Sequence, residues 1–170
     1  MEIATYLLDQ LNRMAGEYYH LFLLIAPPGA GKTTLINYLG QELGLPIINL
    51  NLALSKQLLE LSDRQRALKA SQITQDIIRS HEYAITLIDN NELLFDPALQ
   101  QDPLKLMKIS SRDKNIVSTW NGKIKNGKLI YSEPGHPEFR QYHLHEIKGF
   151  YWQSKDEIKK IIQRPHAYEI

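Results

Sequence analysis

A lysine followed by two threonines ends a glycine-rich stretch whose residue types and spacing could bind phosphate. The stretch reads "APPGAGKTT" and covers residues 26–34. In the pattern G-x-x-x-x-G-K-[ST], curled backbone N–H groups face the anion, the lysine reaches the β- and γ-phosphates, and the hydroxyl binds Mg²⁺. Ala26 replaces the first glycine, a mild change because that position needs a small residue. The expected phosphate contacts are Pro28, Gly29, Ala30, Gly31, Lys32, Thr33 and, toward an α-phosphate, Thr34.

An aspartate ends the apolar run "YAITLID" at residues 83–89. If this run is a buried strand, Asp89 lies at the carboxyl edge of the sheet beside Thr33, and the two would hold the Mg²⁺ of a bound Mg-ATP. The next residue is Asn90, whose amide can hold a water molecule but cannot accept its proton; the nearest acid is Glu92. The sequence leaves open which of Asn90 and Glu92 orients the attacking water, and it predicts slow hydrolysis.

Polar residues also stand at the tip of the predicted strand "NIVSTW", residues 115–120. Ser118, Thr119 and Asn121 lie there, and Thr119 and Asn121 are candidates for sensing the γ-phosphate. Hydroxyl groups that are simply hydrogen-bonded at a strand end are the alternative.

Alternating strands and helices predict an α/β fold with a mainly parallel five-stranded sheet and helices on both faces. Two Asn-Gly pairs within residues 121–139 interrupt the alternation and predict a β-hairpin. Ser62 is expected to cap a second helix within 55–80, and Ser154 with Glu157 to form a capping box. One face of the first helix carries Ile3, Leu7, Leu8, Leu11 and Met14. The predicted strands are 19–26, 46–52, 83–89, 115–120 and 140–147, and the predicted helices are 2–15, 32–43, 55–80, 96–112 and 154–162.

The composition is that of a single globular domain spanning residues 1–170, with 43% hydrophobic and 23% charged residues. The chain has no cysteine, which excludes disulfides and thiolate metal sites. No apolar run reaches the roughly 18 residues of a membrane span, and the N-terminus lacks signal-peptide features, so a cytoplasmic protein is expected. The charge is uneven: residues 1–100 carry 7 Lys/Arg against 11 Asp/Glu, and residues 101–170 carry 13 against 8. A basic half of this kind indicates either a solvated face or an anionic partner.

With these motifs in place, residues 19–146 resemble the additional-strand class of P-loop ATPases, in particular the AAA+ core. "APPGAGKTT" is similar to the phosphate loop of that class, and "LIDNNELLF" to its second motif. Within the class, the chain looks most like the small P-loop protein of bacteriophage-exclusion (BREX) defence systems, on the loop, "DNNELLFDP" and "STWNGKIKNGKLIYSEPGHPEFRQY". The resemblance implies an ATP-binding subunit of a multi-protein, DNA-directed anti-phage system.

The resemblance also implies assembly. In AAA+ proteins an arginine just ahead of the fifth strand enters the neighbouring subunit's site, and Arg140 stands at that place, with Arg112 in reserve. Self-association into a ring or filament is therefore expected, with other defence-system proteins and, directly or through them, DNA as partners. About 24 residues follow the predicted fifth strand, so a helical lid and its second sensor arginine are not expected. Without this lid and arginine, the expected ATPase activity is weak or depends on partners.

Three other interpretations compete with an ATPase. A nucleotide-gated binding module that holds ATP without hydrolysing it is favoured by Asn90. A small kinase is disfavoured because residues 52–80 lack an arginine cluster. His143 and His145 share a strand face, but no third metal ligand accompanies them. "GHPEF", residues 135–139, could contact a partner.

Overall fold

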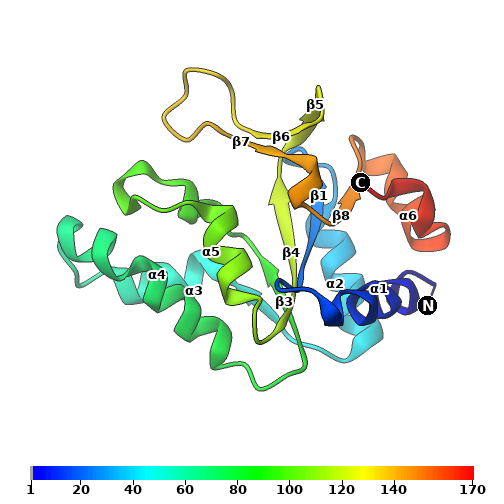
Figure 1. Cartoon of the computed structure of the whole chain (residues 1–170), viewed down its shortest axis with the longest axis horizontal. Coiled ribbons are helices and arrows are strands. Elements are labelled where there is room, and N and C mark those ends of the chain that lie inside the picture. The colour runs from blue at the N-terminus through cyan, green and yellow to red at the C-terminus, as the bar shows by residue number, and fades with distance from the viewer. Residues whose placement is uncertain (1) are drawn as a thin grey trace.

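A five-stranded parallel sheet with strand order β2-β3-β4-β1-β8 forms the centre of the molecule (Figure 1). The computed structural model of the chain describes residues 2–170. The strands are β1 (Leu21–Ala26), β2 (Ile47–Asn49), β3 (Ile85–Asp89), β4 (Asn115–Asn121) and β8 (Gly149–Tyr151). Because every strand runs the same way, the residues at the carboxyl ends of β1, β3 and β4 meet at one edge. The predicted α/β fold is confirmed.

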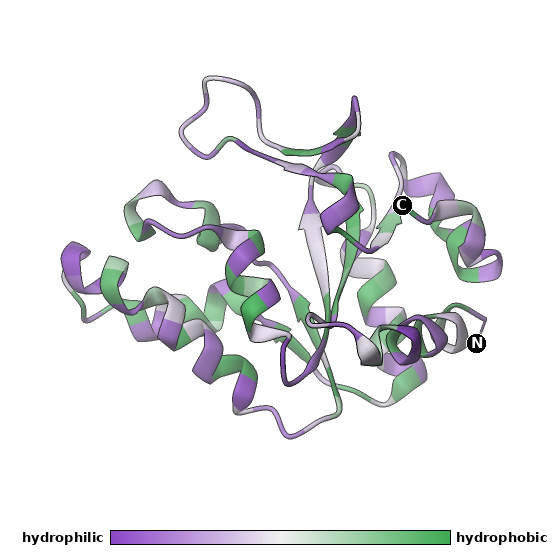
Figure 2. Cartoon of the chain, in the orientation of Figure 1, coloured by the Kyte–Doolittle hydropathy of each residue, from purple (hydrophilic) through white to green (hydrophobic). Residues whose placement is uncertain are grey.

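Helices cover both faces of the sheet (Figures 1 and 2). On one face, Phe22 and Leu24 of β1 pack among apolar residues of α1 (Glu2–Arg13), α2 (Lys32–Leu43) and α6 (Ile158–Gln163). On the other, Leu21, Leu23 and Ile25 pack among those of α3 (Leu50–Leu58), α4 (Asp63–Arg79) and α5 (Pro103–Ser110). Burial on both sides explains the uninterrupted apolar run of β1. None of the helices within residues 2–170 is long and apolar enough to cross a membrane.

Local sequence signals fix the ends of two helices. Gly31 and Gly44, with φ of 94° and 65°, precede and follow α2, since a left-handed backbone at these positions favours glycine. Ser62 forms the expected cap of α4, as a reciprocal capping box with Gln65. In α1, the prediction for Leu8 is wrong: its side chain is 38% exposed, and Tyr6 is buried instead.

The predicted helix over 96–112 is two elements. A 3-10 turn, η3 (Pro97–Leu99), ends at Gln100, whose φ is 52°. The helix α5 then starts afresh at Pro103, with the Asp102 carboxylate accepting from the Lys105 N–H at 3.2 Å. The break occurs because a left-handed residue cannot continue a helix and proline favours its first position.

The segment after β4 forms a small second sheet beyond the carboxyl edge of the main one. It contains β5 (Lys123–Lys125), β6 (Lys128–Tyr131) and β7 (Arg140–His143), paired antiparallel in that order. Asn126 and Gly127, with φ of 53° and 73°, make the predicted hairpin turn. The other Asn-Gly pair makes no turn, because Asn121 is the last residue of β4.

The predicted fifth strand over 140–147 is wrong. Only residues 140–143 form a strand, and they pair with β6 in the small sheet, where Gln141 and His143 are exposed. The fifth strand of the main sheet is β8. Its Gly149 packs so closely on β1 that a Cβ there would lie 1.9 Å from the Leu23 carbonyl oxygen, so only glycine fits.

The C-terminal helix also starts differently from the prediction. The Ser154 hydroxyl donates to the Glu157 carboxylate at 3.3 Å and does not bond the backbone as a cap would. A 3-10 turn, η5 (Lys155–Glu157), therefore leads into α6, and a further 3-10 turn, η6 (Pro165–Tyr168), follows it.

Candidate nucleotide-binding site

A cleft of about 350 Å³ opens at the carboxyl edge of the main sheet, between the phosphate loop and the ends of β3 and β4. The loop joins β1 to α2, and its Gly29 and Gly31 have φ of 79° and 94°. Such left-handed turns let the backbone curl around an anion at the start of a helix. The cleft brings together predicted residues from three separate segments and Lys155 from a fourth. Its lining consists of Pro28, Gly29, Gly31, Lys32, Thr33, Thr34, Asp89, Asn90, Glu92, Asn121 and Lys155.

Lys32 is buried at the base of this cleft. Its ammonium donates to the carbonyl oxygens of Ala26 at 2.9 Å and Pro27 at 2.8 Å. Burial lowers the pKa of Lys32 from 10.5 to about 8, against the opposing attraction of the Glu92 and Asp89 carboxylates. A triphosphate placed here would add phosphate oxygens as direct anionic partners of the buried ammonium.

The lowered pKa predicts that ATP binding takes up a proton near pH 8. Bound phosphates would raise the pKa of Lys32 again, so ATP affinity should fall as the pH rises above about 8. Phosphate groups themselves titrate near pH 6 and do not contribute in this window. Calorimetry at pH 8 in two buffers of different ionisation enthalpy measures the uptake. Lys32→Arg, whose charge persists, should abolish it; wild-type binding without proton uptake would contradict the prediction.

Asp89 is held from three sides at the end of β3. One carboxylate oxygen accepts from the Thr33 hydroxyl at 2.8 Å, and the other from the Thr119 hydroxyl at 2.6 Å and the Asn90 N–H at 3.0 Å. Hydroxyl and carboxylate oxygens are the hard ligands that Mg²⁺ prefers, so Thr33 and Asp89 fit a magnesium ion bound with nucleotide. Thr119 orients the carboxylate from behind.

Glu92 begins a 3-10 turn, η2 (Glu92–Phe95), and its carboxylate lies in the cleft between two amides. One oxygen accepts from Asn51 Nδ2 at 2.8 Å, the other from Asn121 Nδ2 at 3.1 Å. Asn51 is itself fixed, since its N–H donates to the Asn90 carbonyl at 2.7 Å and its side-chain oxygen accepts from Leu93 N–H at 2.8 Å. Asn90 has φ of 55° and also lines the cleft. Asn90 and Glu92, the two candidates for orienting the attacking water, therefore both line the cleft, but only Glu92 has a carboxylate.

Three residues of the site were not predicted from the sequence. Asn51 follows β2, and Asn91, almost fully buried, donates to the Ser118 hydroxyl at 3.0 Å and the Thr119 carbonyl at 2.9 Å. Lys155 reaches the cleft from the C-terminal segment. Asparagine after each of two apolar strands, in "IINLN" and "LIDNN", was the available signal for the first two.

The C-terminal segment also braces the phosphate loop. The Trp152 indole N–H donates to the carbonyl of Ala30 at 2.8 Å. Ala30 itself, predicted as a phosphate contact, does not line the cleft. Ile158 lies so close to Gly31 that a Cβ on that glycine would be 2.9 Å from its side chain. The conformation of the loop thus depends on residues more than 100 positions away.

Arg140 does not stand ahead of the fifth strand, as the sequence predicted. It lies in β7 opposite Tyr131, outside the cleft lining, and its Nη1 donates to the Phe139 carbonyl at 2.9 Å. Lys148 is the residue directly before β8. The reserve candidate, Arg112, packs over the Tyr18 ring, 4.6 Å from its centroid.

The two histidines considered as metal ligands lie at the end of the small sheet. The rings of His143 and His145 stack with centroids 5.5 Å apart. Within residues 2–170, no three histidine or acidic side chains are grouped as they would be around a metal ion. In the "GHPEF" turn, His136 Nδ1 accepts from the Glu138 N–H at 3.0 Å.

The parallel sheet, the loop between β1 and α2, and the aspartate that ends β3 define a P-loop NTPase fold. Residues 22–100, from β1 through β3 to the 3-10 turn η3, match the family described as "ATPase family associated with various cellular activities (AAA)". Over this part of the chain, the similarity to AAA ATPases supports nucleotide binding.

One solved structure similar to the chain is that of PCH-2 from C. elegans. The identity is 18% and the TM-score 0.44, over 95% of this chain and 45% of that one. The chain thus spans less than half the length of that protein. No curated protein matches the chain in sequence.

Proposed function

We propose that the chain is an ATP-binding, slowly hydrolysing AAA+-like subunit. The observation that supports this best is the Glu92 carboxylate, which shares the cleft with Lys32 and with the Thr33–Asp89 pair. A cation for phosphate, oxygen ligands for Mg²⁺ and a general base are the parts that phosphoryl transfer to water needs.

Each part has a role in the proposed reaction. Lys32 binds the β- and γ-phosphates, and Thr33 and Asp89 hold Mg²⁺, which when bound neutralises charge on the phosphates. Glu92 accepts the proton of the attacking water, and Asn121 orients Glu92 and contacts the γ-phosphate. Asn90 lines the cleft without a group that can accept a proton.

A binding module that holds ATP without hydrolysing it is the second candidate. The observation in its favour is that both Glu92 oxygens already accept hydrogen bonds, from Asn51 and Asn121. At least one of the two amides must release this carboxylate before it can bind the attacking water. This arrangement is consistent with turnover that is slow or that depends on a partner.

We further propose that the chain serves a BREX-type anti-phage system as a BrxF-like subunit. The support is the resemblance in the phosphate loop, in "DNNELLFDP" and in the segment of the small sheet, "STWNGKIKNGKLIYSEPGHPEFRQY". In this role its partners would be other defence-system proteins and DNA.

Self-assembly with ATP is part of the proposal. Arg140, on the small sheet, is proposed to reach the γ-phosphate bound by a neighbouring copy, because a guanidinium is always charged and binds phosphate oxygens in pairs. The prediction is that Mg-ATP converts a monomer into a ring or filament, and that Arg140→Ala lowers turnover while each subunit still binds ATP. Light scattering with and without Mg-ATP measures the first effect. A chain that stays monomeric with Mg-ATP at high concentration, yet hydrolyses ATP at a rate per subunit independent of concentration, would contradict the shared site.

A further inference from the structure

Most of the basic residues in the second half of the chain lie outside the nucleotide cleft. Residues 101–170 carry 13 Lys/Arg against 8 Asp/Glu, and of these cations only Lys155 is among the residues lining the cleft. Binding of ATP therefore does not account for this positive charge.

One group of these residues begins at the tip of the β5–β6 hairpin. Lys125 pairs with Lys128 across the hairpin, and Lys128 stands opposite His143 in β7. The His143 ring stacks in turn on that of His145. The exposed hairpin tip is thus joined by a continuous row of basic side chains to η4 (Leu144–Glu146).

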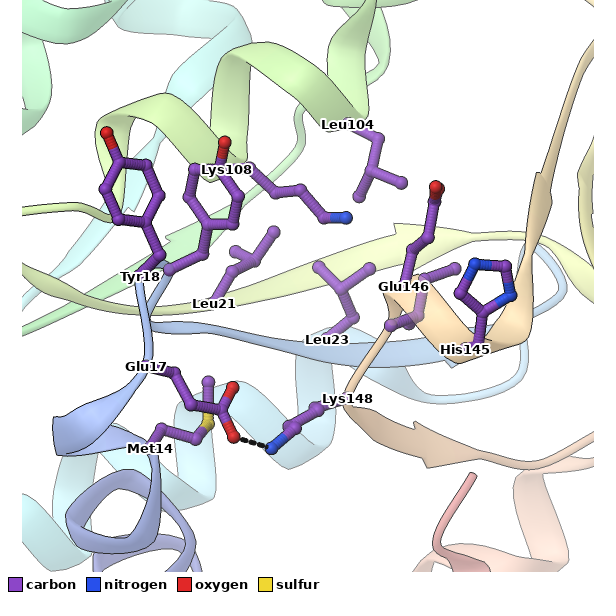
Figure 3. A pocket seen from close by; sticks show the side chains of 12 residues that line it. Met14, Glu17, Tyr18, Leu21, Leu23, Leu104, Lys108, His145, Glu146 and Lys148 are labelled. Atoms are coloured by element: carbon purple, nitrogen blue, oxygen red, sulfur yellow. Dashed lines mark hydrogen bonds and ion pairs between the residues drawn. The ribbon is translucent and has the colours of Figure 1, made fainter.

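His145, the last residue of this row in η4, lines a groove between η4 and α5 (Figure 3). Leu21 and Leu23 of β1 form the apolar floor, and the groove encloses about 140 Å³. Lys108 extends over this floor from α5, and Lys148 lies at the opposite rim, ion-paired with Glu17. Basic side chains from three separate segments therefore converge on one groove.

The far end of the groove carries aromatic rings. Tyr18 is 66% exposed, and the Arg112 guanidinium lies 4.6 Å from its ring centroid. The Lys108 ammonium lies 5.8 Å from the centroid of Tyr19, which also lines the groove. An exposed ring beside cations can stack on a nucleobase while the cations bind the adjoining phosphates.

We propose that this basic row binds the backbone of a single-stranded nucleic acid, with Tyr18 stacking on a base at its end. The row is defined as Lys125, Lys128, His143, His145, Lys108 and Lys148. The lysines of the row are spread along a path, as phosphates are along a strand, and the two histidine rings can donate hydrogen bonds to phosphate oxygens. An exposed ring suits unpaired bases. An acidic peptide would match the charge but would not use the ring.

The inference extends the proposed function, in which the chain serves a DNA-directed system. The row and the ATP cleft share no lining residue, so either can be lost without the other. Within the groove, Glu17 and Glu146 are the carboxylates that oppose the cations. Glu17 also occupies Lys148 in an ion pair, so removing its charge should strengthen binding to a polyanion.

Fluorescence anisotropy with a labelled oligothymidine of about 20 nucleotides tests the proposal on the full chain without ATP. The double charge reversal Lys108→Glu with Lys128→Glu should weaken binding on the order of tenfold or more and make the salt dependence shallower by about 1.4 in log–log slope, from two lost phosphate contacts. Lys56→Glu with Lys159→Glu reverses two exposed lysines of α3 and α6 outside the row and should leave affinity within about twofold. Glu17→Gln should tighten binding.

Several results would overturn this inference. They are no binding by the folded wild-type chain at low salt, equal weakening by the row and control pairs, equal affinity for a duplex of the same length, or equally effective competition by polyglutamate. ATP binding by the row variant, measured in parallel, should be unchanged. A wild-type chain that binds the oligonucleotide but no ATP would refute the proposed ATPase without contradicting the proposed nucleic-acid site.

Discussion

Lys32→Ala is expected to bind ATP on the order of 100-fold more weakly or worse. Removing one partner of a buried, hydrogen-bonded charge pair, here the Lys32 ammonium against the phosphates, costs several kcal/mol of binding free energy. The fold should survive. In the absence of phosphate, the ammonium donates to the loop carbonyls of Ala26 and Pro27, and its lowered pKa shows that burial disfavours its charge. Calorimetric titration with Mg-ATP measures the effect.

The matched control is Lys56→Ala, which removes an exposed lysine of α3 far from the loop in sequence. It should bind ATP like the wild type. Lys155→Ala, at the exposed rim of the cleft, should weaken binding by a few-fold at most, on the scale of an exposed charge pair. A folded Lys32→Ala variant with unchanged ATP affinity would refute the phosphate-loop assignment.

Glu92→Gln is expected to lower ATP turnover by about 100-fold or more while ATP binding is kept, because a general base contributes roughly 10²–10⁴ in rate. The substitution preserves the size of the side chain and removes its ability to accept a proton. Phosphate release from ATP and calorimetric binding separate the two effects.

Asn90→Glu distinguishes the two candidates for orienting the water. If Glu92 is the base, a second carboxylate at residue 90 should not raise turnover. Faster turnover in Asn90→Glu, together with wild-type turnover in Glu92→Gln, would transfer the role to residue 90.

The nucleotide cleft was largely predictable because its main signals are local. The phosphate loop lies within nine consecutive residues, and Asp89 directly ends an apolar strand. Parallel strands then bring Asp89 and Asn121 to the loop without further information, since their carboxyl ends share an edge.

Residues that reach the site through long-range contacts could not be predicted in this way. Asn51 meets Glu92 because β2 pairs with β3, and no local pattern gives that strand order. Trp152 and Lys155 reach the loop because β8 pairs with β1 on its outer side.

The fifth strand was misplaced for a related reason. "RQYHLHEI" has the polar alternation of a half-buried strand, but only its first four residues form one, and they pair with β6 in the small sheet. The true edge strand has only three residues, and its first, Gly149, is required by contact with the β1 backbone rather than by any strand propensity.

The rate of phosphate release from ATP, measured over a range of protein concentrations for the wild type and Glu92→Gln, tests the central claim most directly. We expect slow turnover by the wild type and a rate per subunit that rises with concentration as copies assemble. Glu92→Gln should bind ATP and turn it over about 100-fold or more slowly than the wild type. Wild-type protein that binds Mg-ATP but releases no more phosphate than Glu92→Gln at any concentration would contradict an ATPase and identify the chain as a nucleotide-binding module.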